Sequence, residues 1–329
     1  MVYYFYDAGG KPRKEIALGT DYVLAVKKWS ELEMDAKPRH EQLITLKYCA
    51  DKFLLSDHFK TLSARTQKDY IGQLKFIFMF FNDPPAPMEA IKPHMIQKYM
   101  AWRGKKAPVR ANRERALIST IWNFSRNHGF TDATNPCQGV DGFTEHGRDI
   151  YIEDIVYKAV WDEGDIPLRE ALDLAYLTGQ RPADVIKMNE TDLKDGHITI
   201  VQNKGRGRVK IRMIIEGQLK TLLDRISERK KAFKVRSLAL LCNEKGQKLS
   251  YLAIRSRFAN ARLKAADKNP KLADDIKSYQ IRDLRAKAGT DKADSGDMRQ
   301  AQKQLGHASI TMTEHYVRAR AGEKVKPTK

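Results

Sequence analysis

Apolar residues at helical spacing are the feature that most constrains the fold. From about Glu41 to Val140 they recur three or four positions apart, which is the period of one face of an α-helix. Proline-containing segments at 84–87 and 105–108 interrupt the pattern, because proline removes a backbone donor and restricts the residue before it. This region is therefore predicted to form a bundle of four or five helices.

The first forty residues are expected to form a separate small module. They combine an alternating aromatic start, a turn at Gly9-Gly10 and an amphipathic stretch over Asp21–Met34. Such a pattern indicates a short hairpin followed by a helix, for which Asp21 is a suitable N-terminal cap.

A second domain is predicted beyond a linker at 141–150, a stretch with glycines and no clear period. Alternating segments at His197–Val201 and Val209–Ile214 flank a glycine-rich turn, which indicates a β-hairpin within otherwise helical sequence. The fold class is thus mainly α with a small β-hairpin or sheet. The expected parts are an N-terminal module at 1–40, a helical domain at 41–140, the linker, and a mixed α+β domain at 151–329.

The charge of the chain indicates a polyanionic partner. Sixty Lys and Arg residues against 41 Asp and Glu leave a formal net charge of +19, which favours binding to nucleic acid. Basic residues cluster after the second proline segment. A solvated surface is the alternative there, but the overall charge favours contacts to the DNA backbone. The candidate contacts are Lys105, Lys106, Arg110 and Arg113.

Neither a metal site nor an extracellular location is expected. Cys49, Cys137 and Cys242 lack the spacing of a zinc site or a disulfide framework, which fits a reducing cytosol. The acidic groups at 274–275 and at 291, 294 and 297 are predicted to be solvated helix surface. No apolar run reaches the length of a membrane span, so a cytoplasmic protein without membrane partners is expected.

Three arginines occur in sequence contexts that suit phosphate binding. Arg181 lies between Gly179, a favourable residue just after a helix, and Pro182, a favourable first helical residue, so a sharp corner is predicted there. Arg282 and Arg285 are three apart in a helical pattern and are expected on one face. Guanidinium groups donate two parallel hydrogen bonds to phosphate and remain charged.

An imidazole and a phenol follow at the C-terminal end. A helix is predicted to end at Gly306, just before His307, and another to restart at 311–314 with a capping-box pattern. Tyr316 would then lie within the first two turns of the new helix.

These motifs together resemble the signature of the tyrosine recombinases, or phage integrases. The matching segments are Thr178-Gly179-Gln180-Arg181, Asp283-Leu284-Arg285, Leu305-Gly306-His307 and Thr313 to Tyr316. The resemblance implies strand cutting by Tyr316 through a 3′-phosphotyrosyl link, without metal, ATP or another cofactor. The implied catalytic residues are Arg181, Lys204, Arg282, Arg285, His307 and Tyr316.

Three of the implied assignments carry alternatives. Arg282 stands where the family usually has histidine, and a guanidinium is a poor proton acceptor, so water or His307 would have to serve as the base. Lys204 aligns with the family lysine that protonates the leaving oxygen, but Arg206 and Arg208 on the same turn are confusable neighbours and candidate DNA contacts. Asp184 would either cap a helix or orient Arg181.

The resemblance favours a phage or mobile-element integrase that acts on double-stranded recombination sites as a homotetramer. In such enzymes a DNA-bending host protein and a directionality factor are further partners. By the same resemblance, the domain at 41–140 would bind DNA and the domain at 151–329 would be the catalytic domain. The module at 1–40 would bind secondary arm sites or pack on the next domain. The alternatives are a resolvase or transposon recombinase, or a DNA-binding regulator of this fold that has lost catalysis. An RNA-binding bundle is disfavoured because no aromatic stacking motif is evident.

Overall fold

The computed structural model describes residues 2–7, 12–36, 44–202, 209–295 and 297–321. The chain divides into two compact units, Met1–His146 and Gly147–Lys329, and the division falls inside the segment expected to be a linker. Within the described part of the chain, no helix combines the length and apolar character needed to cross a bilayer.

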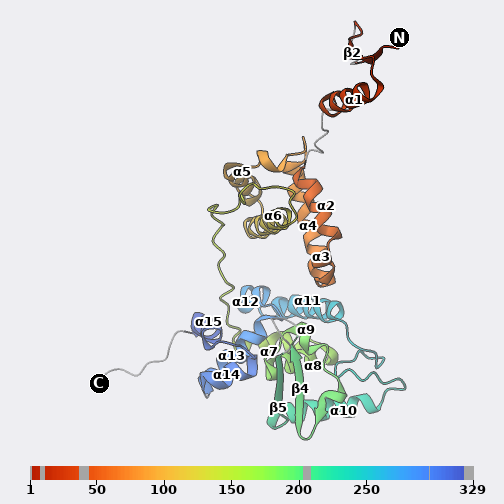
Figure 1. Cartoon of the computed structure of the whole chain (residues 1–329). Coiled ribbons are helices and arrows are strands. Elements are labelled where there is room, and N and C mark those ends of the chain that lie inside the picture. Colours follow the sequence, from red (N-terminus) through yellow and green to blue (C-terminus); the bar gives the residue numbers. More distant parts are fainter. Residues whose placement is uncertain (1, 8–11, 37–43, 203–208, 296, 322–329) are drawn as a thin grey trace. The chain divides into compact units, whose positions relative to one another are not determined.

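The N-terminal module is a two-stranded antiparallel sheet with one helix (Figure 1). Strands β1 (Tyr4–Asp7) and β2 (Glu15–Gly19) pack with α1 (Tyr22–Ala36) around Tyr6, Leu18 and Ala25. Asp21 caps the helix, because its Oδ1 accepts a hydrogen bond from the Leu24 backbone at 3.0 Å. The expected turn at Gly9-Gly10 lies outside the described residues.

The expected helical bundle is present. Its elements are α2 (Leu46–Leu55), α3 (Asp57–Thr61), α4 (Ala64–Phe81), the 3-10 turn η1 (Met88–Ala90), α5 (Pro93–Gly104) and α6 (Pro108–Asn127). Ser63 caps α4 by accepting from the Thr66 backbone at 3.2 Å. Asn135 closes the bundle through hydrogen bonds from its Nδ2 to Ser119 and Asn123 on α6.

The second unit is mainly helical, with one small sheet. Its helices are α7 (Asp154–Asp162), α8 (Ile166–Thr178), α9 (Pro182–Val185), η2 (Glu190–Asp192), α10 (Gly217–Lys231), α11 (Tyr251–Lys268), η3 (Pro270–Leu272), α12 (Ala273–Ser278), α13 (Asp283–Ser295), α14 (Met298–Leu305) and α15 (Ile310–Ala321). Figure 1 shows α13, α14 and α15 together at one side of this unit, where each packs against the other two.

The sheet has the antiparallel order β3-β4-β5, so a short strand precedes the predicted hairpin. The strands are β3 (Leu193–Lys194), β4 (His197–Gln202) and β5 (Val209–Ile214). Alternate residues of β4 are buried, namely Ile198, Ile200 and Gln202. The same alternation that places two isoleucines in the core therefore also places the Gln202 amide inside the protein.

Candidate active site

The loop between α8 and α9 forms the corner that positions Arg181. Gly179 ends α8 in the left-handed conformation, with φ of +65°, and Pro182 begins α9 directly after Arg181. A side chain at 179 would be strained by this backbone and would lie 3.3 Å from Leu305 Cδ2. The predicted corner is thus present, and Arg181 is partly exposed at its tip.

Arg285 is buried beneath this corner. It extends from α13, and its Nη1 donates to the Gly179 carbonyl at 2.9 Å. Its Nη2 donates to the Leu305 carbonyl at 2.6 Å and contacts His307 Nε2 at 3.1 Å. Two helix ends, those of α8 and α14, are therefore joined by one guanidinium.

His307 lies in this cluster as a neutral imidazole. Burial, followed by the charges of Arg285 and Arg181, lowers its pKa to about 4. Because a guanidinium cannot accept a hydrogen bond, Nε2 accepts from Arg285, and Nδ1 carries the proton and donates to Thr313 Oγ1 at 3.0 Å. Thr313, on α15, is fully buried and is a site residue that the sequence reasoning missed.

Two glutamines were also missed. Gln202 Oε1 lies 3.4 Å from Arg181 Nη1, and Gln202 Nε2 donates to Gln180 Oε1 and to the Leu305 carbonyl, both at 2.8 Å. Both glutamines are buried. A signal for Gln202 existed in the sequence, because it shares the alternating face of Ile198 and Ile200.

Arg282 does not share the environment of Arg285. Helix α13 begins at Asp283, so Arg282 lies in the preceding turn and is exposed. Asp283 terminates the turn by accepting from the Gln280 backbone at 2.8 Å and is paired with Arg148 at 2.8 Å. The expectation that both arginines lie on one helix face is wrong, because the helix starts between them.

The nucleophile candidate lies on the helix that also carries Thr313. Tyr316 belongs to α15, of which the structure describes the backbone at this position. The helix begins one residue earlier than expected, at Ile310, and Ser309 Oγ accepts from the Thr311 backbone at 3.2 Å. Lys204, Arg206 and Arg208 lie outside the described residues.

The remaining acids have separate surroundings. Asp184 is buried at the third position of α9, as expected for an acid near a helix N-terminus. Asp291 is not solvated surface, because it accepts hydrogen bonds from Tyr151 and Tyr176 and pairs with the buried Lys287 at 3.1 Å. No group of three or more His, Cys, Asp or Glu side chains arranged to hold a metal ion occurs among the residues described.

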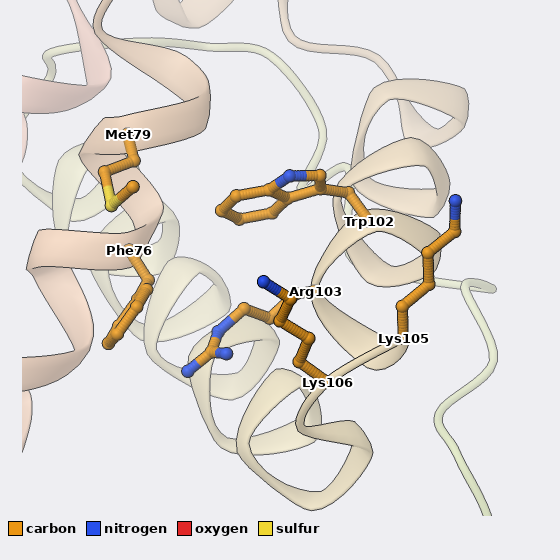
Figure 2. Close-up of a pocket in the computed structure, with 6 residues that line it drawn as sticks. All are labelled: Phe76, Met79, Trp102, Arg103, Lys105 and Lys106. Carbon is orange, nitrogen blue, oxygen red and sulfur yellow. The ribbon is translucent and has the colours of Figure 1, made fainter.

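Two predicted DNA contacts, Lys105 and Lys106, line a pocket of about 290 Å³ on the helical bundle. Figure 2 shows Phe76 and Met79 on α4 opposite Trp102 and Arg103 on α5. Both lysines are exposed.

Other basic side chains on α5 and α6 differ in whether they form an ion pair. Arg103 is matched by buried Glu114 at 2.9 Å. Arg110 is exposed, and Arg113 pairs with Glu145 at 2.7 Å.

Comparisons with known proteins extend across this site. A sequence profile described as the phage integrase family matches residues 152–323, more than half of the chain. The integrase of Escherichia phage HK022 is 27% identical over 331 residues, covering 94% of this chain and 89% of that protein.

Solved structures show the same fold. A lambda integrase dimer bound to a COC′ core site has a TM-score of 0.71 at 22% identity, covering 98% of this chain and 95% of that one. A lambda integrase tetramer bound to a Holliday junction has a TM-score of 0.72 at 21% identity, with the same coverage. The Tn1549 transposon integrase with transposon right end DNA has a TM-score of 0.67 at 15% identity, covering 83% and 94%. Because the family profile spans all the motifs that converge here, the chain belongs to the phage integrase family of tyrosine site-specific recombinases.

Proposed function

We propose that this recombinase cuts and rejoins DNA at a specific site through a covalent bond between Tyr316 and a DNA 3′-phosphate. The observation that carries the proposal is the convergence of Arg181, Arg285 and His307 from three separate helix ends. Two guanidinium groups supply the charge that a phosphodiester needs in its transition state.

The reaction conserves the energy of the broken bond. The Tyr316 oxygen attacks phosphorus and loses its proton to water, the bond from phosphorus to the 5′ oxygen breaks, and that oxygen takes up a proton. Reversal of these steps with a new 5′ hydroxyl rejoins the strand. Because one phosphate ester replaces another, the exchange needs no external energy source.

Lys204 is assigned as the proton donor to the leaving oxygen. In the sequence, Lys204 comes two residues after Gln202. Gln202 is the last residue of β4, and its side-chain amide lies next to Arg181. An ammonium can lose its proton once its pKa is lowered, whereas a guanidinium cannot. Arg206 and Arg208 are assigned to the DNA backbone, and exposed Arg282 to a phosphate next to the cut.

His307 is assigned as a proton-dependent phosphate ligand. Burial and two arginines favour the neutral ring, and its pKa is lowered to about 4. An anionic phosphate has the opposite effect, because a nearby negative charge stabilises imidazolium. His307 therefore takes up a proton as DNA enters and then donates to a phosphate oxygen. Asp184, buried beside this corner, is assigned to orient Arg181.

The helical bundle supplies further DNA contacts through Lys105, Lys106, Arg110 and Arg113, and the module at 1–40 binds a second DNA site. Lambda integrase has been solved as a dimer on a core site and as a tetramer on a Holliday junction. We assign the same homotetrameric assembly to this chain, acting in the cytoplasm of a bacterial host with a DNA-bending protein and a directionality factor.

Integration of a phage genome is favoured by the match to the HK022 integrase over 94% of the chain. A transposon recombinase is the second candidate, because the Tn1549 integrase shares the fold. A regulator without catalysis is the third, since Arg282 replaces the family histidine.

Covalent capture tests the proposal. The protein is incubated with nicked fragments of its source genome, denatured in SDS, and the attached DNA is sequenced. Nicks trap the intermediate because the short leaving strand diffuses away. The wild type should retain one discrete site and Tyr316→Phe none. Tight DNA binding by both proteins without covalent attachment would favour the regulator.

A further inference from the structure

We propose that Gln180 and Gln202 form a two-amide relay that aims the Arg181 guanidinium at the scissile phosphate. In this view Gln202 is a positioning residue for strand cleavage. The inference rests on the proposed function, because it concerns how one of its phosphate ligands is held.

The relay is fully hydrogen-bonded. Gln180 Nε2 donates to the Thr178 carbonyl at 2.9 Å and to the Gln304 carbonyl at 2.8 Å. Gln180 Oε1 accepts from Gln202 Nε2, whose second donor bond goes to the Leu305 carbonyl. A side-chain amide has two N–H donors, so the donors of both glutamines are all used.

This bonding gives the relay a direction. Each Nε2 faces backbone carbonyls, which can only accept, so neither amide can be flipped without placing two acceptors together. The one group left to face Arg181 is Gln202 Oε1, at 3.4 Å from Nη1. The backbone at the ends of α8 and α14 therefore determines that an acceptor points at the arginine.

The relay also connects the two arginines. The Leu305 carbonyl accepts from Gln202 at 2.8 Å and from Arg285 at 2.6 Å, which occupies both of its lone pairs. Gly306 leaves space for this arrangement, because a Cβ at 306 would lie 2.8 Å from Gln202 Nε2. A change at Gln202 should thus alter the position of Arg181 relative to Arg285.

A neutral amide suits this task better than an acid. A carboxylate at 202 would form an ion pair that competes with phosphate for Arg181, whereas an amide oxygen orients the guanidinium and leaves its net charge for DNA. A carboxylate would also repel the Leu305 carbonyl and Gln180 Oε1, which now accept from Nε2.

A double-mutant cycle tests the relay. Gln202→Met keeps the length of the side chain and removes its hydrogen bonds. The matched control is Gln304→Met, because Gln304 Nε2 donates to the Leu177 carbonyl at 3.2 Å and, among the residues that the structure describes, its side chain makes no hydrogen bond to an arginine. Gln202→Met should slow single-turnover cleavage by about 10- to 100-fold, as expected for one lost bond to a charged group, with DNA affinity changed less than about threefold. In an Arg181→Ala background, Gln202→Met should slow cleavage further by less than about threefold.

A spectroscopic measurement gives the same test without requiring cleavage. The side-chain ¹⁵N signals of Arg181, assigned by comparison with Arg181→Ala, report the order of its guanidinium. We expect Gln202→Met to lower that order and Gln304→Met to leave it unchanged.

Two results would overturn the relay: equal loss of cleavage with and without Arg181, or unchanged Arg181 order in Gln202→Met. If the wild type never cleaves DNA while Arg181 still loses order in Gln202→Met, the proposed function fails and the relay stands as the means of positioning Arg181.

Discussion

At the scale of single residues, the site is built from groups that hold one another in place. Arg285 is 3% exposed and uses both terminal nitrogens on backbone carbonyls and His307. Arg282, three positions earlier, is exposed. The two arginines provide a matched pair for separating a role inside the site from a role at its surface.

Replacement of each arginine by lysine should give very different losses. Arg285→Lys removes the planar fork that spans two carbonyls and should slow cleavage by at least about 100-fold. Arg282→Lys retains an exposed positive charge and should slow it by less than about tenfold. Rates are measured on a nicked core-site substrate. Equal losses of cleavage rate in the two variants would contradict the assignment of Arg285 to the interior of the site and of Arg282 to its surface.

His307 should make folding stability depend on pH. Its pKa of about 4 in the folded chain lies below the ordinary value of about 6.5, so the unfolded chain binds more protons between these values. The contribution of His307 to the free energy of unfolding is therefore fully present above about pH 6.5. It is lost as the pH drops toward 4, which lowers the free energy of unfolding by at most about 3 kcal/mol.

Urea unfolding at pH 7 and pH 5 measures this contribution. His307→Gln should lose less stability on acidification than the wild type. The control His146→Gln, at an exposed histidine, should lose as much stability between pH 7 and pH 5 as the wild type. The same pH dependence in His307→Gln and the wild type would show that His307 is not held neutral.

At the scale of elements, helix ends determine where the site residues lie. Gly179 and Gly306 both have φ of +65°. Arg181 follows Gly179 by two residues, and His307 follows Gly306 directly. Each helix thus terminates with a left-handed glycine one or two residues before a functional side chain. Substitution at either glycine should affect the site through the backbone.

Gly306→Ala should destabilise the second unit by more than backbone strain alone. Its Cβ would lie 2.8 Å from Gln202 Nε2 and 3.0 Å from Ile211 Cδ1. Gly196→Ala is the control, because Gly196 has φ of +69° and no atom within 4 Å of a Cβ. We expect about 1 kcal/mol for the control and at least about 2 kcal/mol for Gly306→Ala, measured by thermal unfolding. Similar losses of stability in Gly306→Ala and Gly196→Ala would show that the close contacts of a Cβ at 306 do not destabilise the protein.

The sequence predicted these elements well where one local rule governs them. The bundle, the hairpin strands, the glycine at the end of α8 and the cap at Asp21 follow from apolar period and capping chemistry. The amide relay did not follow, because Gln180, Gln202 and the Leu305 carbonyl are distant in sequence and meet only in the folded unit. Arg282 was misplaced for a different reason: a helical spacing does not specify at which residue the helix starts.

At the scale of the whole molecule, the charge of +19 is carried by both units. Lys105 and Lys106 are exposed beside an apolar pocket, whereas Lys47 on the same bundle is paired with Asp51 at 2.7 Å. A lysine without a carboxylate partner gains more binding free energy from a phosphate contact than a lysine that already has such a partner.

Charge removal at the pocket should therefore weaken DNA binding in a salt-dependent way. The double variant Lys105→Ala, Lys106→Ala should make the negative slope of log affinity against log salt concentration less steep by about 1 to 2, because each phosphate contact contributes about 0.9 to its magnitude. Lys47→Ala should leave the slope unchanged. Titrations of a core-site duplex at several salt concentrations measure it, and an unchanged slope in the double variant would exclude these lysines from the contact surface.

The identity of the residue that carries the DNA tests the account most directly. The covalent complex formed on nicked DNA is digested with nuclease and trypsin, and the modified peptide is sequenced by tandem mass spectrometry. We predict a nucleotide 3′-phosphate on Tyr316 within the peptide 304–318. A nucleotide on His315 or on a residue outside α15 would contradict the assignment of Tyr316 as the nucleophile.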